Sequence, residues 1–207
     1  MIDTTAIIQS ILPDLHADTV ADLYFWTEGD LIRWEDECVK RLARVAAVFV
    51  LRDDSRVARA GQPEYALPPR HVTTLHVSLG TVPLRPANME ELEGLDPAFQ
   101  TTPGTPKHWY EDKLAAPELW LSPVPVAAVA GTPVPMVFNS WPPELDAGKV
   151  NTTLAAPPPV KGYIAMAVLG AAYQIEGESE MPDVAAHCRG RLELYERTFQ
   201  AYFGKGI

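Results

Sequence analysis

The side chains whose types and spacing best suit metal chemistry lie near the C-terminus. Asp183 and His187 are four residues apart, and Cys188 follows directly. A zinc site needs several such ligands in suitable geometry, but Cys188 falls on the apolar side of the helix predicted here and His187 does not. We therefore expect a local contact between Asp183 and His187, and no metal site.

An acidic cluster precedes that helix. It consists of Glu176, Glu178, Glu180 and Asp183. Carboxylates are the ligands that calcium prefers, but the spacing is not that of an EF-hand loop. We interpret the cluster as a solvated turn between two helices.

Two histidines in the middle of the chain raise the question of phosphate chemistry. His71-Val72-Thr73 and His76-Val77-Ser78 each resemble the His-x-Thr/Ser element of two-histidine phosphoesterases. Those enzymes carry the two elements on separate strands, so that both imidazoles face one phosphate. Here the separation is odd and falls on one predicted strand, which points the side chains to opposite faces. We expect no catalytic residue, and no motif indicates a bound cofactor.

The charge balance argues against a protein that grips nucleic acid. The formal net charge is −10, whereas DNA binding needs clustered Lys and Arg facing phosphates. An acidic lining repels DNA and would keep a passage non-sticky. The plainer interpretation is that the charge keeps the protein soluble.

Cysteine usage and the N-terminus indicate a cytosolic setting. Cys38 and Cys188 both fall on apolar helix faces, so we expect buried free thiols rather than a disulfide. Residues 1–12 lack the basic stretch of a signal peptide. No apolar run reaches the ~20 residues of a membrane span.

Helices are predicted at both ends of the chain. Over 182–203, apolar residues recur at alternating steps of three and four, with Pro182 at the start and Gly204 as a plausible C-cap. Residues 162–175 carry no charge, so a helix there must be covered on every side. Near the N-terminus we predict helices over 3–12 and from Thr27, the second with Trp34 and Cys38 in its core.

The middle of the chain predicts strands and loops. The 20 prolines concentrate between Pro63 and Pro159. Strands are predicted at 72–79, 82–85, 118–121, 124–130 and 134–138, and an acidic helix at 88–95. We predict an α+β fold in which 1–47 and 159–207 form a helical bundle, and 48–158 form a β-rich, proline-rich insertion.

Aromatic residues beside prolines are typical of contact surfaces, although they are equally expected in the core of the β-rich part. Together with two residues of the C-terminal end, they are our candidate interface residues: Trp109, Tyr110, Trp120, Trp141, Phe203 and Ile207.

The order of these features resembles the head–tail adaptors of tailed bacteriophages, also called head completion or tail tubular proteins. A Trp-containing N-terminal helix is followed by Tyr65-Ala66-Leu67-Pro68, which runs into a strand. Next comes Gly104-Thr105-Pro106 leading to Trp109-Tyr110. A strand ending in Pro123-Val124-Pro125 follows, and two helices close the chain.

The resemblance implies a non-enzymatic subunit of a ring, with about twelve copies in relatives. Such a ring lies in the virion neck under the portal protein, extends the DNA channel and meets the next tail or nozzle protein, so DNA passes through without specific binding. Assembly takes place in the host cytoplasm, without a membrane. The C-terminal tail would dock onto the portal. The alternatives are an α+β binding module with an aromatic pocket and, less in keeping with the spacing, the phosphoesterase.

Overall fold

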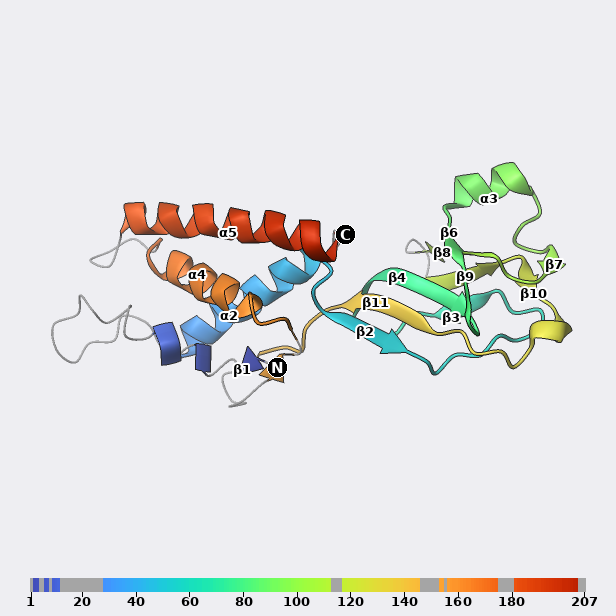
Figure 1. Ribbon diagram of the computed structural model, residues 1–207, viewed down its shortest axis with the longest axis horizontal. Helices are drawn as coiled ribbons and strands as arrows, with labels where there is room; N and C mark the ends of the chain where they lie inside the picture. The colour runs from blue at the N-terminus through green and yellow to red at the C-terminus, as the bar shows by residue number, and fades with distance from the viewer. Residues whose placement is uncertain are drawn as a thin grey trace. The chain divides into compact units, whose positions relative to one another are not determined.

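The chain has an α+β fold that divides into two compact units. The computed structural model describes residues 2–3, 6–7, 9–11, 28–112, 117–145, 153–154, 156–174 and 181–204 (Figure 1). The helical unit combines Met1–Phe49 with Trp141–Ile207, and the β unit is Val50–Ser140. The expected junctions were 47/48 and 158/159, so residues 141–158 group with the helices here.

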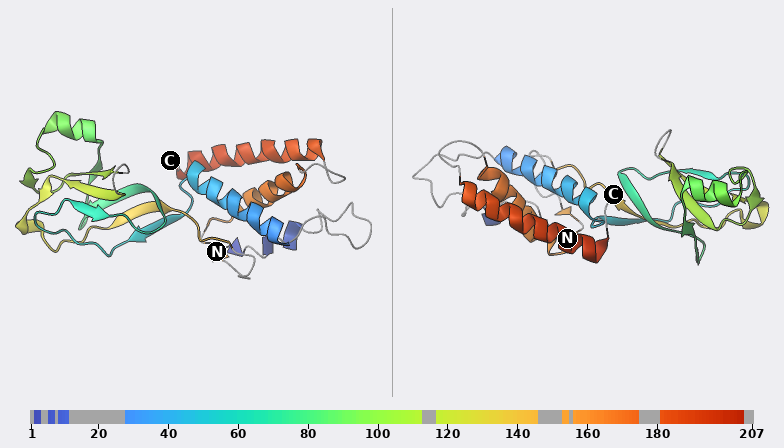
Figure 2. Two further views of the ribbon diagram at one scale, coloured as in Figure 1. Left: turned by 180° about the vertical axis from the view of Figure 1, so that it is seen from behind. Right: turned by 90° about the horizontal axis from the view of Figure 1, so that it is seen from above.

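Helices α2 (Glu28–Val45), α4 (Val160–Ala172) and α5 (Pro182–Phe203) form the helical unit. Helix α4 lies against both α2 and α5, and all views place it beside α5 (Figures 1 and 2). Strand β1 (Ile2–Asp3) pairs with β12 (Thr153–Leu154) in an antiparallel ladder. Asp3 is therefore in a strand and not in the predicted helix over 3–12, of which residues 6–7 and 9–11 are described as helical.

The helix ends follow from local chemistry. Pro182 opens α5, where a missing N–H costs nothing. Gly204 ends it with φ 81°, a conformation that favours glycine, and its N–H bonds to Gln200 O. Helix α4 begins and ends two to three residues before the predicted 162–175, and its side chains Val160, Tyr163, Ile164 and Val168 are buried.

Two four-stranded sheets, one antiparallel and one mixed, make up most of the β unit within the described residues. The first has the order β2-β11-β4-β5 and the second β3-β9-β8-β6. The strands of the first are β2 (Val50–Asp53), β11 (Met136–Ser140), β4 (His71–Leu79) and β5 (Val82–Pro83). Those of the second are β3 (Glu64–Ala66), β9 (Glu118–Ser122), β8 (His108–Asp112) and β6 (Arg85–Pro86).

One apolar core joins both sheets. It includes Val77 and Met136 from the first sheet and Leu119 and Leu121 from the second, all at most 1% exposed. Helix α3 (Met89–Leu95) covers a separate small cluster through Leu92. Asn88 caps this helix in a capping box with Glu91. The Asn88 side chain accepts from the Glu91 backbone N–H, and the Glu91 carboxylate accepts from the Asn88 backbone N–H.

Several predicted strands differ from the structure. The pairing of β4 with β11 shifts register twice, so strict alternation along 72–79 is lost, and Leu75 and His76 are both exposed. The predicted strand 124–130 is only β10 (Val124–Pro125), which pairs in parallel with β7 (Pro103–Gly104), followed by the 3-10 turn η1 (Ala127–Val129). Sequence periodicity does not predict which short, proline-containing segments pair when they lie far apart in the chain.

Candidate functional site

The helical unit contains a groove between α2 and α5, with α4 as its floor. Helices α2 and α5 meet where Arg41 Nε lies 2.8 Å from Glu196 Oε1 and where Gln200 Nε2 donates to Val45 O at 3.2 Å. Further back along both helices a cavity of about 280 Å³ separates them. We call this cavity the interhelical groove.

Small side chains open the groove and apolar ones line it. Ala167, Gly170 and Ala171 of α4 form the floor, and Trp34 and Leu192 stand on the flanking helices. A Cβ built at Gly170 would lie 3.1 Å from Cys188 Cβ, so α4 and α5 are in close contact beneath the groove. The result is a depression with an apolar floor, of a size suited to one or two side chains.

Charged groups stand at the rim of the groove. Glu37 of α2 and Arg189 of α5 are exposed there, while Arg41 is held by the carboxylate of Glu196. The bond with Glu196 raises the pKa of Arg41. The buried Tyr163 hydroxyl donates to Glu196 Oε1 at 2.9 Å, and burial raises the pKa of Tyr163. The rim therefore offers one positive and one negative side chain.

The thiol of Cys38 lines the groove and is not in its reactive form. Cys38 and Cys188 are free and buried, which confirms the sequence-based prediction. Burial, reinforced for Cys38 by the nearby Glu35 carboxylate, raises the pKa of both thiols. Thiolate is the reactive form of cysteine, so neither residue is suited to nucleophilic chemistry.

Helix α5 carries exposed apolar side chains. Val184, Leu194 and Tyr202 are 38%, 57% and 84% exposed. The same helix buries Ala185, Cys188 and Phe199; at about 100° per residue Leu194 lies on the far side from these three, whereas Val184 and Tyr202 lie at the edge of the buried face.

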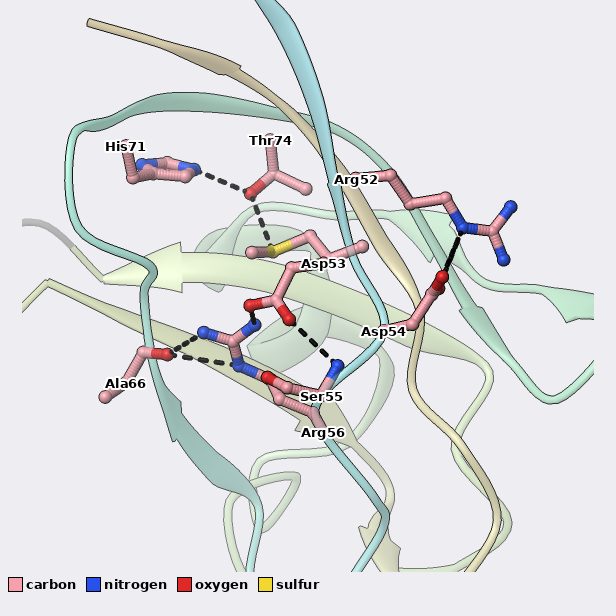
Figure 3. A network of polar contacts seen from close by, with 9 residues as sticks. Arg52, Asp53, Asp54, Ser55, Arg56, Ala66, His71 and Thr74 are labelled. Atoms are coloured by element: carbon pink, nitrogen blue, oxygen red, sulfur yellow. Dashed lines mark hydrogen bonds and ion pairs between the residues drawn. The ribbon is translucent and has the colours of Figure 1, made fainter. Parts of the chain in front are cut away.

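The two histidines that suggested phosphate chemistry do not converge. His71 Nε2 lies 3.0 Å from Thr74 Oγ1 (Figure 3). It also lies 3.1 Å from Glu111 Oε1, and the His71 ring stacks on Phe138 at 5.5 Å. His76 is exposed. Glu111 also accepts a bond from the Thr74 backbone N–H, so its carboxylate ties β8 of one sheet to β4 of the other.

A second polar network joins the same two sheets. The Arg56 guanidinium donates both to the Asp53 carboxylate at the end of β2 and to the Ala66 carbonyl in β3 (Figure 3). The Ser55 backbone N–H donates to Asp53 Oδ1 at 2.9 Å. Both networks lie within the β unit. They are therefore structural links between its two four-stranded sheets.

Metal chemistry finds no support in the described residues. In that part of the chain no group of three or more His, Cys, Asp and Glu side chains is placed to hold an ion. Asp183 and His187 are both exposed, and no hydrogen bond or ion pair joins them in the described helix. The predicted contact between them was wrong because both side chains are free to be solvated. Glu176, Glu178 and Glu180 lie outside the described residues.

Comparison with known proteins decides between the remaining interpretations. The family model of the SU10 adaptor protein matches residues 3–206, which takes in both units. The chain belongs to the SU10 adaptor protein family. No curated protein matches it. Its role is that of a structural phage adaptor, a virion component, as the order of motifs along the chain indicated.

Two of the adaptor's candidate interface residues are buried. Trp109 and Tyr110 are 7% and 4% exposed. Alternation along β8 places Trp109 in the core between the sheets and Tyr110 in the cluster under α3. Trp120 is half-buried and stacks on Tyr110 at 5.6 Å. These aromatic side chains pack within the adaptor's β unit.

The other candidates belong to the adaptor's helical unit. Trp141 is half-buried, with the Arg44 guanidinium 6.0 Å from its ring. Phe203 is half-buried against Phe199 at 6.0 Å, and Ile207 lies outside the described residues. Sequence reasoning missed the exposed apolar residues of α5: Tyr202 continues the apolar spacing of this helix and was expected on its covered side, but it is 84% exposed. No helix in the described part of the chain has the length and apolarity needed to cross a membrane.

Proposed function

We propose that this adaptor is the subunit of a ring in the phage neck. The ring would dock onto the portal protein on one side and the tail or nozzle protein on the other. The observation that carries the proposal is the family match over 3–206, because it covers the helical and the β unit together. The role is structural, with no bond made or broken.

The distribution of histidines and thiols favours a structural role over a catalytic one. His71 is fixed by Glu111 and Thr74 while His76 faces solvent, so they do not form a phosphate site. Burial keeps Cys38 protonated. An enzyme would instead need such groups to converge in an accessible cleft.

The acidic balance supports a passage for DNA that does not bind it. The net charge of −10 repels the phosphate backbone, and clustered basic side chains would slow a moving duplex. In this proposal the ring extends the DNA channel of the portal, and the host cytoplasm is the place of assembly.

The test is the mass of the purified chain, alone and mixed with the portal protein of its phage. We expect a closed ring, formed alone or on the portal, with about twelve copies as in relatives. Light scattering after size-exclusion chromatography gives the mass, and electron microscopy gives the symmetry. A chain that stays monomeric and does not bind the portal would refute the proposal.

A further inference from the structure

We propose that the outer edge of strand β2 is a docking edge, at which another protein of the phage neck adds an extended strand to the first sheet. The inference rests on the proposed function, because it takes the partner to be a protein that lies next to the ring. It names the surface that holds this partner and the kind of segment that the surface accepts.

Strand β2 is the outermost strand of the first sheet and pairs on one side only, with β11. The neighbouring strand shows which way its backbone groups point. The Ser78 N–H donates to Pro135 O, so Pro135 faces β4. Because backbone groups alternate in direction along a strand, Met136 faces β2, where it pairs with Asp53. The backbone groups of Asp53 are therefore directed toward β11.

The same alternation identifies the open groups of β2. Leu51 also faces β11, where it pairs with Phe138, whereas Val50 and Arg52 face away from the sheet. No described residue bonds to the backbone N–H or C=O of Val50 or Arg52. These donors and acceptors are therefore available to a further strand.

Prolines block the outer edges of β5 and β6. The N–H groups of Leu84 and Arg85 donate to a carbonyl of β4 and to that of the residue before β8. The adjacent Pro83 and Pro86 therefore occupy the outward-facing positions of β5 and β6. Proline cannot donate a backbone hydrogen bond, and proteins use it at sheet edges against unwanted pairing.

Side chains block the outer edge of β3. Glu64 O accepts from Gln62 Nε2 at 2.9 Å, and Ala66 O accepts from the Arg56 guanidinium (Figure 3). Both carbonyls face outward, because the N–H of the following Leu67 donates to the residue before β9. Among the outer edges of the two four-stranded sheets, only that of β2 is open within the described residues, which marks it as a surface for a partner strand.

The charges beside the open edge are compensated within the subunit. Arg52 Nε lies 2.8 Å from Asp54 Oδ1, and the Asp53 carboxylate accepts from Arg56 (Figure 3). Uncompensated charge along an edge strand is one of the devices that keep other strands away. Because each of these carboxylates has a guanidinium partner, a further strand can approach β2 without meeting a repelling charge.

The occupant that fits this edge is an extended segment of a different protein. Val50 and Leu51 are 46% and 37% exposed and lie on opposite faces of the sheet, so apolar side chains beside them would become buried. A second copy cannot offer a described outer edge other than β2, because β3, β5 and β6 are blocked. Two β2 edges would pair like with like, which joins copies in twos and does not build a ring. The segment is therefore a partner's extended, proline-free strand with an apolar residue beside Val50.

The docking edge is tested by removing one of its donors. Arg52→Pro deletes an outward N–H to which no described residue bonds, and it places a ring where the partner strand would lie. It should weaken binding of the full chain to the portal protein or to the tail protein about tenfold or more. Biolayer interferometry measures the two affinities separately, and sedimentation velocity measures self-association, which should not change.

Two further variants are matched controls. Arg52→Ala keeps the N–H while removing the side chain, so it should bind as the wild-type chain does. Glu64→Pro changes the outward N–H of the blocked edge of β3, and it should leave both affinities unchanged. Circular dichroism verifies that each variant is folded.

Hydrogen exchange tests the same edge without a substitution. In the free chain the amides of Val50 and Arg52 should exchange fast and that of Leu51 slowly, because only Leu51 bonds to β11. Binding of the partner should slow exchange at Val50 and Arg52 about tenfold or more and leave the outward amide of Glu64 unchanged. If Arg52→Pro does not fold, this measurement decides alone, and unchanged exchange at Val50 and Arg52 would overturn the inference.

The outcomes separate this inference from the proposed function. If the wild-type chain binds the portal or tail protein and Arg52→Pro binds both as tightly, the docking edge is wrong and the proposed function stands. If Arg52→Pro loses self-association while both affinities stay the same, a second copy occupies the edge and the partner named here is wrong. If the wild-type chain binds neither protein, the proposed function fails together with this inference.

Discussion

Arg41 of α2 and Glu196 of α5 form a bidentate pair, with Nε 2.8 Å from Oε1 and Nη2 3.2 Å from Oε2. This pair closes one end of the interhelical groove, since α2 and α5 otherwise pack mainly on α4. The arrangement sets the width of the opening, and it lends itself to direct tests.

Removing the Glu196 carboxylate should destabilise the helical unit. Glu196→Ala leaves the buried Tyr163 hydroxyl without its acceptor, which costs about 1–3 kcal/mol. Glu196→Gln is the matched control, because the amide oxygen still accepts from Tyr163 and the loss should be about 1 kcal/mol. Urea unfolding monitored by circular dichroism measures both. Equal losses for the two variants would show that the hydroxyl does not depend on Glu196.

Close helix packing beneath the groove predicts opposite effects of one substitution at two glycines. A Cβ at Gly170 would lie 3.1 Å from Cys188 Cβ, whereas nothing lies within 4 Å of a Cβ at Gly190. Gly190→Ala should stabilise α5 by about 0.5–1 kcal/mol through helix propensity. Gly170→Ala should destabilise by about 1 kcal/mol, because neither helix backbone can withdraw. Thermal unfolding compares them, and a stabilising Gly170→Ala would contradict the packing described.

The Asp53–Arg56 link should make the stability of the β unit pH-dependent. Partial burial raises the pKa of Asp53, but the bonds from Ser55 and Arg56 outweigh it, so this pKa lies below the usual 3.8. A lowered folded-state pKa stabilises the protein above pH 3.8, and the contribution is lost as the pH falls through the folded-state value. Asp53→Asn should therefore cost about 1–2 kcal/mol at neutral pH and progressively less in acid.

The neighbouring pair Arg52–Asp54 is the control for that measurement. Its side chains are 64% and 59% exposed, so Asp54→Asn should cost at most about 0.5 kcal/mol. Denaturant titrations at several pH values give both curves. A cost for Asp53→Asn that is the same at pH 7 and pH 3 would count against the role of this carboxylate.

The buried thiols should resist modification in the folded protein. Because burial raises the pKa of Cys38 and Cys188, the native chain at pH 8 should react with a disulfide reagent only on the time scale of unfolding. Both thiols should react within seconds in denaturant. Rapid reaction of one thiol in the native state would reveal an opening of the helical unit.

Local chemistry predicted the helical part of this fold well. Pro182 and Gly204 fix the ends of α5 because proline and glycine each suit one terminus of a helix. Trp34 and Cys38 are buried as their spacing indicates, and the absence of charge over 162–172 matches the burial of Tyr163, Ile164 and Val168 in α4. All of these signals lie within one turn or one helix face.

The β unit and the surfaces depend on contacts that are distant in the sequence. The bulges in β4 arise from its pairing with β11, some sixty residues away, and they expose both Leu75 and His76. From the sequence alone, Trp109 and Tyr110 are equally consistent with contact residues and with core residues. The structure decides between the two, because both sides of β8 are covered. The groove exists only once α2 and α5 are both placed on α4, so its lining residues carry no pattern of their own.

The central claim, that this adaptor joins the filled head to the tail, is tested most directly by electron microscopy of particles made without it. A stop codon in the gene, with the wild-type chain supplied in trans as control, isolates its contribution. We predict heads that lack tails, and normal virions on complementation. Tailed, infectious particles assembled in its absence would contradict the account.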